Sequence, residues 1–454
     1  MLQEARMRVQ LSDHFTYRKL FTFVLPPIAM MLLTSVYTMV DGLFVSHFVG
    51  KTAFAAVNFV FPVVILMAGL GSMFGTGGTA LVAKTLGEGA KNRAKRYFTQ
   101  IILLASLFGA LMGGFGCLWL PEICRLLGAT PELLPDALTY GRIMLIFLPC
   151  CILQWTFQSL LITAEKAQLA FWLSVAGGVT NIIADAIFMA WLGWGVAGAA
   201  VATGISQMVA GLVPVLYFIL PNNSLLRFRR TRFQPRPMLQ ACSNGASELV
   251  SSISGALVGM LYNYQLIRYF GENGVAAYGV VMYVAFFFVA IFIGYDMGST
   301  PLLAYNHGAE NHEELRNLFR KSVTLVGTCG ASLAVLSIIF SRPVATLFVG
   351  YNEELTRLTE HAFWVYGLSF ALMGYNIFAS GLFTAMNNGL ISATISLLRT
   401  FIFQATAVLC LPLLFGTEGI WWSVSVAEIF ALAFSAGFVL KYRKRYHYLP
   451  SCES

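Results

Sequence analysis

The sequence predicts an all-α membrane protein in which twelve transmembrane helices form two six-helix lobes related by an internal parallel repeat. The first observation is composition: of 454 residues, 57% are hydrophobic and only 11% are charged, whereas soluble proteins carry roughly 25% charged residues. The second is that the charges gather in short tracts between long apolar stretches. The third is that the two halves match at a nearly constant offset. A soluble globular fold is therefore excluded.

Each apolar stretch is long enough for a helix to cross a hydrocarbon core of roughly 30 Å. The short, strictly alternating segments of a transmembrane barrel do not occur, and helices satisfy their backbone hydrogen bonds within one segment. Prolines such as Pro149 predict breaks inside spans, which membrane helices tolerate. The expected spans are 20–46, 55–83, 97–120, 137–164, 170–192, 195–220, 241–270, 276–306, 318–342, 359–385, 391–412 and 418–440.

The basic residues predict the orientation. With the N-terminus in the cytoplasm, 22 Lys and Arg lie inside and six outside, and Arg399 falls within a span. This bias places both termini in the cytoplasm under the positive-inside rule and supports an even number of spans. It also explains the net charge of +8 without a nucleic-acid partner. We expect an N-lobe at 1–220, a basic cytoplasmic linker at 221–240 and a C-lobe at 241–454.

The internal repeat is clearest between residues 55–87 and 276–308, which align without a gap at an offset of 221. Gly77 meets Gly298 and Gly87 meets Gly308 in this alignment. Six spans per half is an even number, so both halves enter the membrane in the same direction and the repeat is parallel. We therefore expect two lobes that face each other across a cleft and rock to give alternating access.

The candidate cation-coupling site is a set of polar side chains in the first half. Asp41 ends a stripe on one helix face that begins with Thr34 and Tyr37. Asn181 and Asp185 are one turn apart in the fifth span, and Thr203 lies in a small-residue segment of the sixth, which permits close helix approach. Two carboxyls, an amide and a hydroxyl can bind Na⁺ or share a proton. The alternative is a structural, hydrogen-bonded or permanently protonated carboxyl.

Three further acids lie inside spans, and a charge in hydrocarbon costs at least ~2.5–3.5 kcal/mol. Glu248 and Asp296 are candidates for a substrate or second cation site, together with Tyr37. The alternatives are an interfacial position for Glu248 and a local hydrogen bond to Ser299 or Thr300 for Asp296. Glu428 is a weaker candidate. Arg399 is expected to extend toward the membrane surface, with an ion pair as the alternative.

Several classes of protein are excluded by missing motifs. There is no GxxxxGK[ST] motif for an ATP-driven motor and no HExxH motif. The eight cysteines form no CxxC pair, so neither a disulfide framework nor a metal site is expected from them. We therefore expect no enzyme, no cofactor and no metal beyond Na⁺ at the four coupling residues. An ion gradient, of H⁺ or Na⁺, is the expected energy source.

The chain resembles the multidrug and toxic compound extrusion (MATE) family over essentially its whole length. The resemblance rests on PPIAMM from Pro26, VDGLFVSHFVG from Val40, the AAVN segment opening the second span, NIIADAIF from Asn181 and GVAGAAVAT from Gly195. It implies a drug/H⁺ or drug/Na⁺ antiporter in a bacterial-type plasma (inner) membrane, closest to the DinF-like and MepA-like branch. In the branch with an N-lobe cation site, the matching positions are Asp41, Asn181, Asp185 and Thr203.

Another branch of that family uses an acid in the seventh span together with acids in the tenth. Glu248 fills the first role here, but the tenth span offers Tyr375 and Asn376 and no acid, so a C-lobe site of that kind is not expected. Near the sixth span, Asp185 and Thr203 align roughly with Leu409 and Ala427. We therefore expect the N-lobe to bind the coupling ion and the C-lobe mainly to help bind cargo.

The leading hypothesis is a monomeric exporter of small organic cations in the lipid bilayer. An alternative is a flippase for a lipid-linked oligosaccharide, which has the same fold in the wider superfamily. More cationic residues would then be expected in the cleft, whereas the spans hold five acids against Arg399. A channel, a receptor or an inactive relative is the third possibility.

Overall fold

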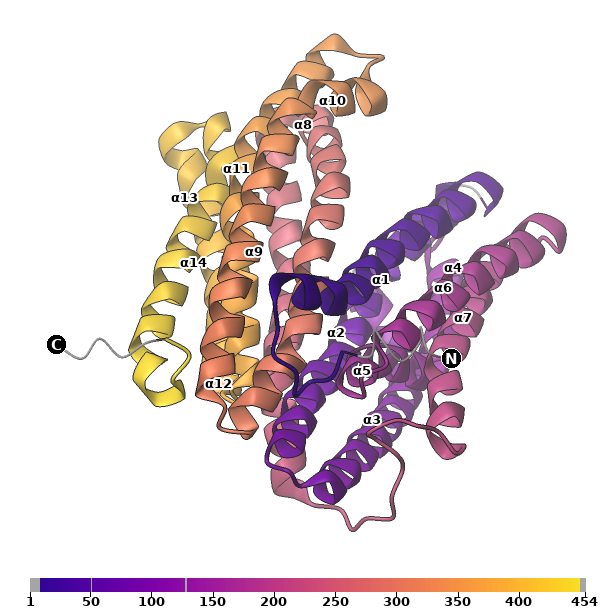
Figure 1. The fold of residues 1–454 in the computed structure, drawn as a ribbon. Helices are drawn as coiled ribbons and strands as arrows, with labels where there is room; N and C mark the ends of the chain where they lie inside the picture. The colour runs from indigo at the N-terminus through magenta and orange to yellow at the C-terminus, as the bar shows by residue number, and fades with distance from the viewer. Residues whose placement is uncertain (1–8, 50, 127–128, 450–454) are drawn as a thin grey trace.

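The computed structural model describes residues 9–49, 51–126 and 129–449, and every regular element in these ranges is helical (Figure 1). The first half contains α1 (Tyr17–Phe44), η2 (Val45–Val49), α2 (Lys51–Gly87), α3 (Lys91–Leu126), α4 (Leu134–Ile146), α5 (Leu148–Thr163), α6 (Ala167–Asp185), η3 (Ala186–Trp191) and α7 (Gly195–Ile219). The second half contains α8 (Pro235–Gly308), α9 (His312–Ile339), α10 (Ser341–Val349), α11 (Glu353–Ala385), α12 (Gly389–Leu397), η4 (Leu398–Phe403), α13 (Gln404–Phe415) and α14 (Thr417–Tyr446).

The described helices account for the twelve predicted spans. Ten are long and apolar enough to cross a membrane, and the pair α4 and α5, bent by 55°, makes an eleventh. The helix at the remaining predicted span is the first part of α8, from Pro235 to a break at Gly271, where φ is 63° and ψ is −148°, and it does not meet the same test. This part is more polar, since it contains Asn244, Ser247 and Glu248. The predicted all-α membrane fold is confirmed.

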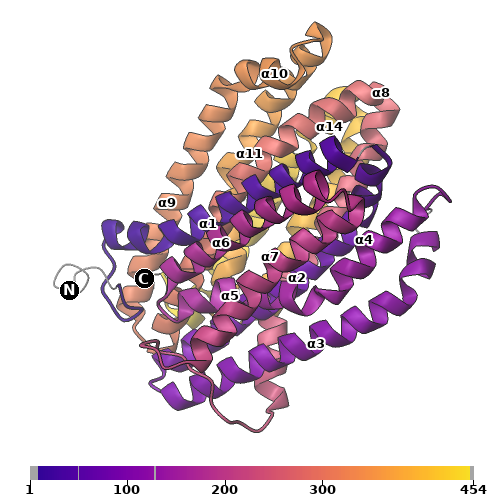
Figure 2. The ribbon, with the colours of Figure 1, turned by 90° about the vertical axis from the view of Figure 1, so that its right-hand side faces the viewer.

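The two lobes form a V. In Figure 1 the helices of the first half diverge from those of the second half toward the end at which α10 lies, and the halves approach each other at the opposite end. Figure 2 shows the same molecule from the side, with α10 again at one extreme and the α7–α8 connection at the other. Helix α8 joins the lobes, since it packs against both α1 and α2.

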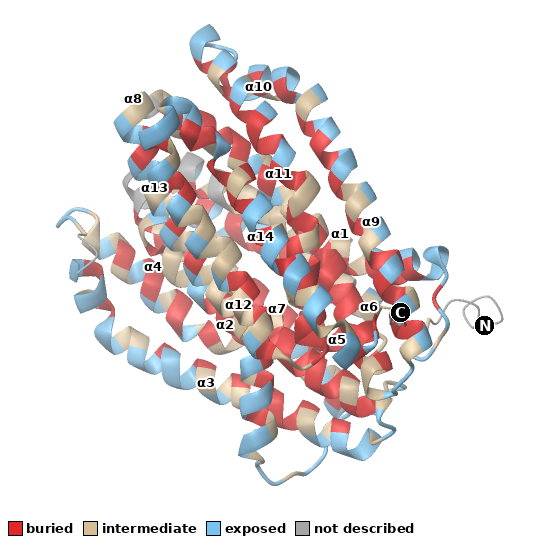
Figure 3. Cartoon of the chain, turned by 90° about the vertical axis from the view of Figure 1, so that its left-hand side faces the viewer, coloured by how far each residue is buried: buried red, intermediate tan, exposed pale blue. Residues whose placement is uncertain are grey.

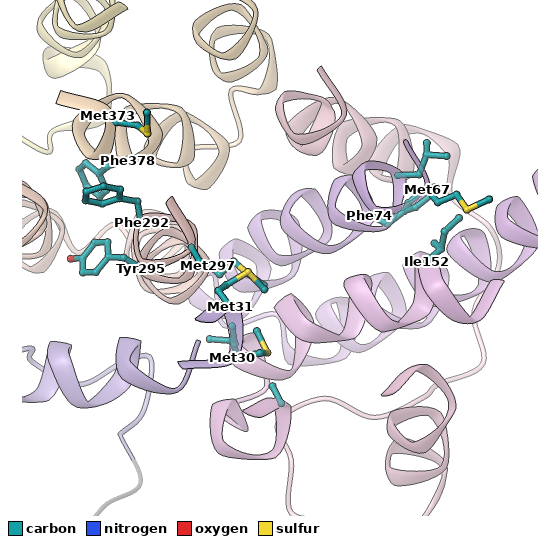
Figure 4. Packing of buried hydrophobic residues seen from close by; sticks show 14 of the residues in the cluster. Met30, Met31, Met67, Phe74, Ile152, Phe292, Tyr295, Met297, Met373 and Phe378 are labelled. Carbon is teal, nitrogen blue, oxygen red and sulfur yellow. The ribbon is translucent and has the colours of Figure 1, made fainter. Parts of the chain in front are cut away.

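The outer faces of the helices are apolar, as the composition predicts. On α3, exposed side chains recur every four residues, at Leu103, Leu107, Leu111 and Phe115, which places them on one face. The opposite face is buried, and Figure 3 shows the alternation of exposed and buried residues along α3. A helix at a water-facing surface would carry polar residues on its exposed face, so this surface is suited to lipid.

Close packing at the narrow end of the V follows the repeat. A methyl group added to Gly87 would overlap the backbone oxygen of Tyr305, and one added to Gly308 would overlap that of Lys84. Gly87 aligns with Gly308 and Lys84 with Tyr305 at the offset of 221, so the two contacts are related by the pseudo-symmetry. Glycines here let α2 and the end of α8 meet backbone to backbone.

Gly87→Ala and Gly308→Ala are each expected to weaken this joint between the lobes. Overpacking costs about 1–3 kcal/mol, which shifts a two-state equilibrium by roughly one to two powers of ten. Spin labels on exposed Lys91 and Glu313 should show a longer distance distribution in each variant. Gly437→Ala, which meets no atom within 4 Å, is the matched control. Unchanged distances in both glycine variants would contradict the role of this contact.

Both segments that precede the first helix of a lobe bond to the other lobe. The backbone N–H of Phe15 donates to Glu314 Oε1 at 2.9 Å, and Asn317 Nδ2 donates to the Phe15 oxygen at 3.0 Å. In the connection between α7 and α8, the N–H of Gln234 donates to Gln100 Oε1 at 3.0 Å. Because α8 begins at Pro235, the last six residues of the predicted 221–240 linker are helical.

Candidate functional site

The carboxyl groups of Asp41 and Asp185 lie within hydrogen-bonding reach of each other inside the N-lobe. Asp41 comes from α1 and Asp185 from the end of α6, two helices that pack together. Asp185 is fully buried, and neither of its oxygens, nor Oδ1 of Asp41, has a hydrogen-bond partner in the described structure. Because a carboxylate is only an acceptor, a proton or a metal cation is the species that can join two such groups.

The other two predicted coupling residues, Asn181 and Thr203, lie on α6 and on the adjacent helix α7. Asn181 is 2% exposed, one turn before Asp185 on α6, and Thr203 lies on α7, which packs against α6. The buried Asn181 Oδ1 and Thr203 Oγ1 atoms also have no partner in the part of the chain that the structure describes. Buried polar atoms are nearly always hydrogen-bonded, so the concentration of unpartnered oxygens on α1, α6 and α7 identifies a candidate binding site.

Tyr37 belongs to the same site. Its ring packs against Gly178 of α6, where an added methyl group would stand 3.2 Å from Tyr37 Cδ1. Its hydroxyl is within hydrogen-bonding reach of the side chains of Thr34 and Gln154. The polar stripe of α1 that the sequence predicts therefore faces α6 and α5 rather than lipid.

Further polar residues near this site were missed by the sequence reasoning. Gln154 and Gln158 of α5 and Gln207 of α7 are each less than a tenth exposed and have side-chain atoms without a partner in the described chain. The spacing of these glutamines in the sequence could have predicted them. Gln154 and Gln158 are one turn apart, as are Thr203 and Gln207, so each pair marks a polar face on an apolar helix.

A proline break places the fourth span beside this site. The bend of 55° between α4 and α5 falls at Phe147, two residues before Pro149, whose ring prevents the normal helical hydrogen bond. Phe147 then inserts against Gly204 of α7, where an added methyl group would overlap its ring. The position aligned with Pro149 is Phe370, which lies within the unbroken α11. The break is thus specific to the N-lobe.

The three π-helical segments found in the described ranges each lie next to or contain a charged residue of a span. Segment η2 follows Asp41 closely, η3 begins directly after Asp185, and η4 contains Arg399. A π-helical turn widens the helix and leaves backbone groups in altered positions, and such turns are frequent at functional sites. The π-helical segments therefore lie at or near the same positions as the charged residues Asp41, Asp185 and Arg399.

A second pair of acids lies in the two halves of α8. Glu248 and Asp296 are close enough to interact electrostatically. Asp296 is 9% exposed, and its carboxyl packs so closely on Gly381 of α11 that a methyl group there would overlap it. Ser299 donates to the backbone oxygen of Asp296 at 3.3 Å, and Asp296 Oδ1 has no partner in the described structure. The alternative, in which the Asp296 carboxyl bonds to backbone groups of Ser299 or Thr300, is not seen among the hydrogen bonds of the described residues.

Arg399 does not extend toward the membrane surface, and this expectation is wrong. Its Nε donates to both carboxylate oxygens of Glu428, at 3.0 and 3.1 Å. Arg399 lies on the face of α12 and η4 that carries the buried Ser392 and Ser396, so it points into the C-lobe. Asn376 Nδ2 donates to Glu428 Oε2 at 2.7 Å and to its backbone oxygen at 3.1 Å.

The Asp41–Asp185 pair and Glu428 therefore differ in how their charge is balanced. The carboxyls of Asp41 and Asp185 face each other without a cation from the protein, whereas Glu428 is neutralised by Arg399. Within the described ranges, no group of three or more His, Cys, Asp or Glu side chains is placed to hold a metal ion. The atoms in the N-lobe that could bind a cation are instead carboxyl, amide and hydroxyl oxygens. This set suits a hard monovalent cation or a proton.

Comparisons with known proteins agree with this architecture. The family model described as MatE matches residues 26–187 and 249–408, one segment in each half. The multidrug export protein MepA of Staphylococcus saprophyticus is 24% identical over 424 residues, which cover 92% of this chain and 92% of that protein. The probable multidrug resistance protein YoeA of Bacillus subtilis is 24% identical over 376 residues, 80% of this chain and 81% of that protein.

A solved structure of a multidrug resistance MATE family transporter of the MOP superfamily, in an outward-facing conformation, superposes with a TM-score of 0.86. It is 21% identical and covers 95% of this chain and 98% of its own. At this identity the similarity establishes the fold. The resemblance inferred from the sequence, including the similarity to MepA-like proteins, is confirmed.

Proposed function

This chain belongs to the MatE family, and we propose that it is a secondary active antiporter that exports organic, mainly cationic compounds in exchange for H⁺ or Na⁺. Family membership makes it a multi-pass membrane transporter rather than an enzyme. The antiport, the coupling ion and the cationic cargo are our proposals. Two relatives are named for multidrug export or resistance, which supports this class of cargo.

The observation that carries the proposal is the carboxyl pair of Asp41 and Asp185, buried without a donor between them. Such a pair holds a proton between its two groups, or binds Na⁺ with the oxygens of Asn181 and Thr203. Releasing that ion leaves two negative charges in a low-dielectric interior, which is unfavourable unless a cation replaces it. The coupling ion and the cationic cargo compete for the same acidic lobe, so that binding of one releases the other. This competition produces the exchange.

Alternating access follows from the V. From the basic connections we infer that the narrow end is cytoplasmic. The wide end then opens outward, and both termini lie on the cytoplasmic side of a bacterial plasma membrane. Binding of the ion from outside releases cargo, and rocking of the lobes about α1, α2 and α8 closes the wide end. The lobes then separate at Gly87 and Gly308.

A flippase for lipid-linked oligosaccharides is less well supported by the charges. Its anionic phosphates would need free cationic side chains inside the lobes. Arg399, the basic residue that the sequence places within a span, is already paired with Glu428 at 3.0 Å. The polar atoms that lack partners in the N-lobe are mainly oxygens, which attract cations.

Ethidium efflux from proteoliposomes, with a pH gradient and a Na⁺ gradient imposed separately, tests this function. We expect efflux to follow at least one of the two gradients and to stop when an ionophore dissipates that gradient. Efflux that ignores both gradients, or ion current without ethidium movement, would contradict antiport. Gradient-dependent movement of a labelled lipid-linked sugar, without ethidium efflux, would favour the flippase.

A further inference from the structure

The basic connection between α7 and α8 is folded onto the start of α3 rather than extended into solvent. Gln100 Nε2 donates to Thr231 Oγ1 at 2.7 Å and to the Arg232 oxygen at 2.9 Å. The backbone N–H of Arg229 donates to Thr99 Oγ1 at 3.0 Å. Together with the bond from Gln234 to Gln100, these contacts fix the backbone on both sides of Arg230.

An aromatic contact anchors the same segment. Phe228 packs on Phe98 with ring centroids 5.5 Å apart and on Phe218 at 6.3 Å. The C-terminal segment repeats this contact, since Tyr448 stacks on Phe319 at 5.2 Å, and Phe319 aligns with Phe98 at the offset of 221. The segment after each sixth span thus packs on the third span of its own lobe.

The first of these two segments lines a basic cavity. A cavity of about 460 Å³ is lined by Arg96, Arg230, Thr231, Arg232 and Gln234. Its lining residues include three arginines and no acid, and none of the three arginines forms an ion pair within the described chain. In the C-lobe, Asn317 occupies the position aligned with Arg96. The repeat therefore does not preserve the arginine at this position of the third span.

Exposed apolar side chains stand beside this cavity. Phe233, within the segment that lines it, is 63% exposed, and Leu239 of α8 is 68% exposed. At the end of α7, Ile219 and Leu220 are 63% and 61% exposed. The connection lies where α3 and α8 begin and α7 ends, at the narrow end of the V (Figures 1 and 2). Charged and apolar groups thus meet where these helices begin and end.

We propose that this cavity binds the phosphate-bearing headgroup of an anionic phospholipid of the cytoplasmic leaflet, with its acyl chains along Phe233 and Leu239. Guanidinium groups bind phosphate oxygens in pairs of parallel hydrogen bonds, and Thr231 and Gln234 supply neutral polar contacts. A free phosphate ion would make no favourable contact with the adjacent apolar surface, whereas the acyl chains of a lipid would. The proposal rests on the cytoplasmic placement of this connection, but not on antiport or on the cargo.

The test is lipid binding to the purified full chain, measured by native mass spectrometry for the first bound lipid. Wild-type protein should bind phosphatidylglycerol more tightly than phosphatidylcholine. The variant Arg96→Gln/Arg230→Gln/Arg232→Gln should lose this preference, with phosphatidylglycerol affinity falling at least about tenfold, since a basic residue near an anionic surface contributes about fivefold. Phosphatidylcholine binding should not change.

The matched control is Arg316→Gln/Arg320→Gln/Lys444→Gln. It removes the same charge from exposed residues at the cytoplasmic ends of α9 and α14, and it should bind phosphatidylglycerol as the wild type does. Equal loss in the two variants would overturn the site in favour of a general surface charge effect. Displacement of phosphatidylglycerol by millimolar inorganic phosphate would overturn the lipid in favour of a free anion.

Discussion

Asp41→Asn and Asp185→Asn are each expected to abolish gradient-driven ethidium efflux while the protein stays folded. Asparagine has the size of aspartate but cannot take up or release a proton, and it provides one neutral oxygen in place of a carboxylate. Its amide can donate to the carboxyl that remains, so the buried oxygens of the pair gain a partner that they lack in the wild type. Folding therefore stays intact while exchange fails.

Proteoliposome efflux under an imposed pH or Na⁺ gradient measures the loss, and thermal unfolding in detergent measures the fold. Glu132→Gln removes one negative charge from an exposed residue just before α4, and this control should transport as the wild type does. Wild-type efflux in both aspartate variants would refute the assignment of the coupling site. Loss of folding in both would instead make the pair structural.

Arg399→Met is expected to lower the free energy of unfolding by about 3–5 kcal/mol, the usual cost of removing one partner of a buried ion pair. Glu428 is completely buried and would keep only its hydrogen bonds from Asn376. The double variant Arg399→Met/Glu428→Gln should recover most of this loss, because glutamine keeps the shape and the acceptor for Asn376 without a charge.

Equilibrium unfolding in mixed micelles compares the two variants. Arg342→Met, at an exposed position near the start of α10, should change stability by less than about 0.5 kcal/mol. Equal destabilisation in the single and double variants would mean that packing of the Arg399 side chain, rather than the unpaired charge, is what matters. The same result would remove the contrast between Glu428, neutralised by Arg399, and the carboxyl pair of Asp41 and Asp185.

The polar face of each helix was predictable because it depends only on the helical period. Thr34, Tyr37 and Asp41 recur at one-turn spacing, as do Asn181 and Asp185. The two pairs Gln154–Gln158 and Thr203–Gln207 obey the same rule. Of these four residues only Thr203 was predicted, because an amide in an apolar helix stands out less than a carboxyl, although buried amides are equally in need of partners.

The partners across helices were not predictable in the same way. Arg399 and Glu428 are 29 residues apart on different helices, and periodicity does not say which faces meet. The preference of long basic side chains for the membrane surface favoured the wrong outcome for Arg399. Inside the lobe, the buried carboxylate of Glu428 provides a stronger interaction than the distant surface.

The all-α membrane fold, the parallel repeat and the helix faces of Asp41 and Asp185 could be predicted from the sequence alone, because hydropathy, internal similarity and helical period are properties of the chain itself. Tertiary structure alone decided that Asp41 meets Asp185, that Arg399 neutralises Glu428, and that Arg96 joins Arg230 and Arg232 around one cavity. Each of these depends on how helices distant in sequence pack. The energy of a charge in a low-dielectric interior depends on which charged and polar groups lie next to it in space.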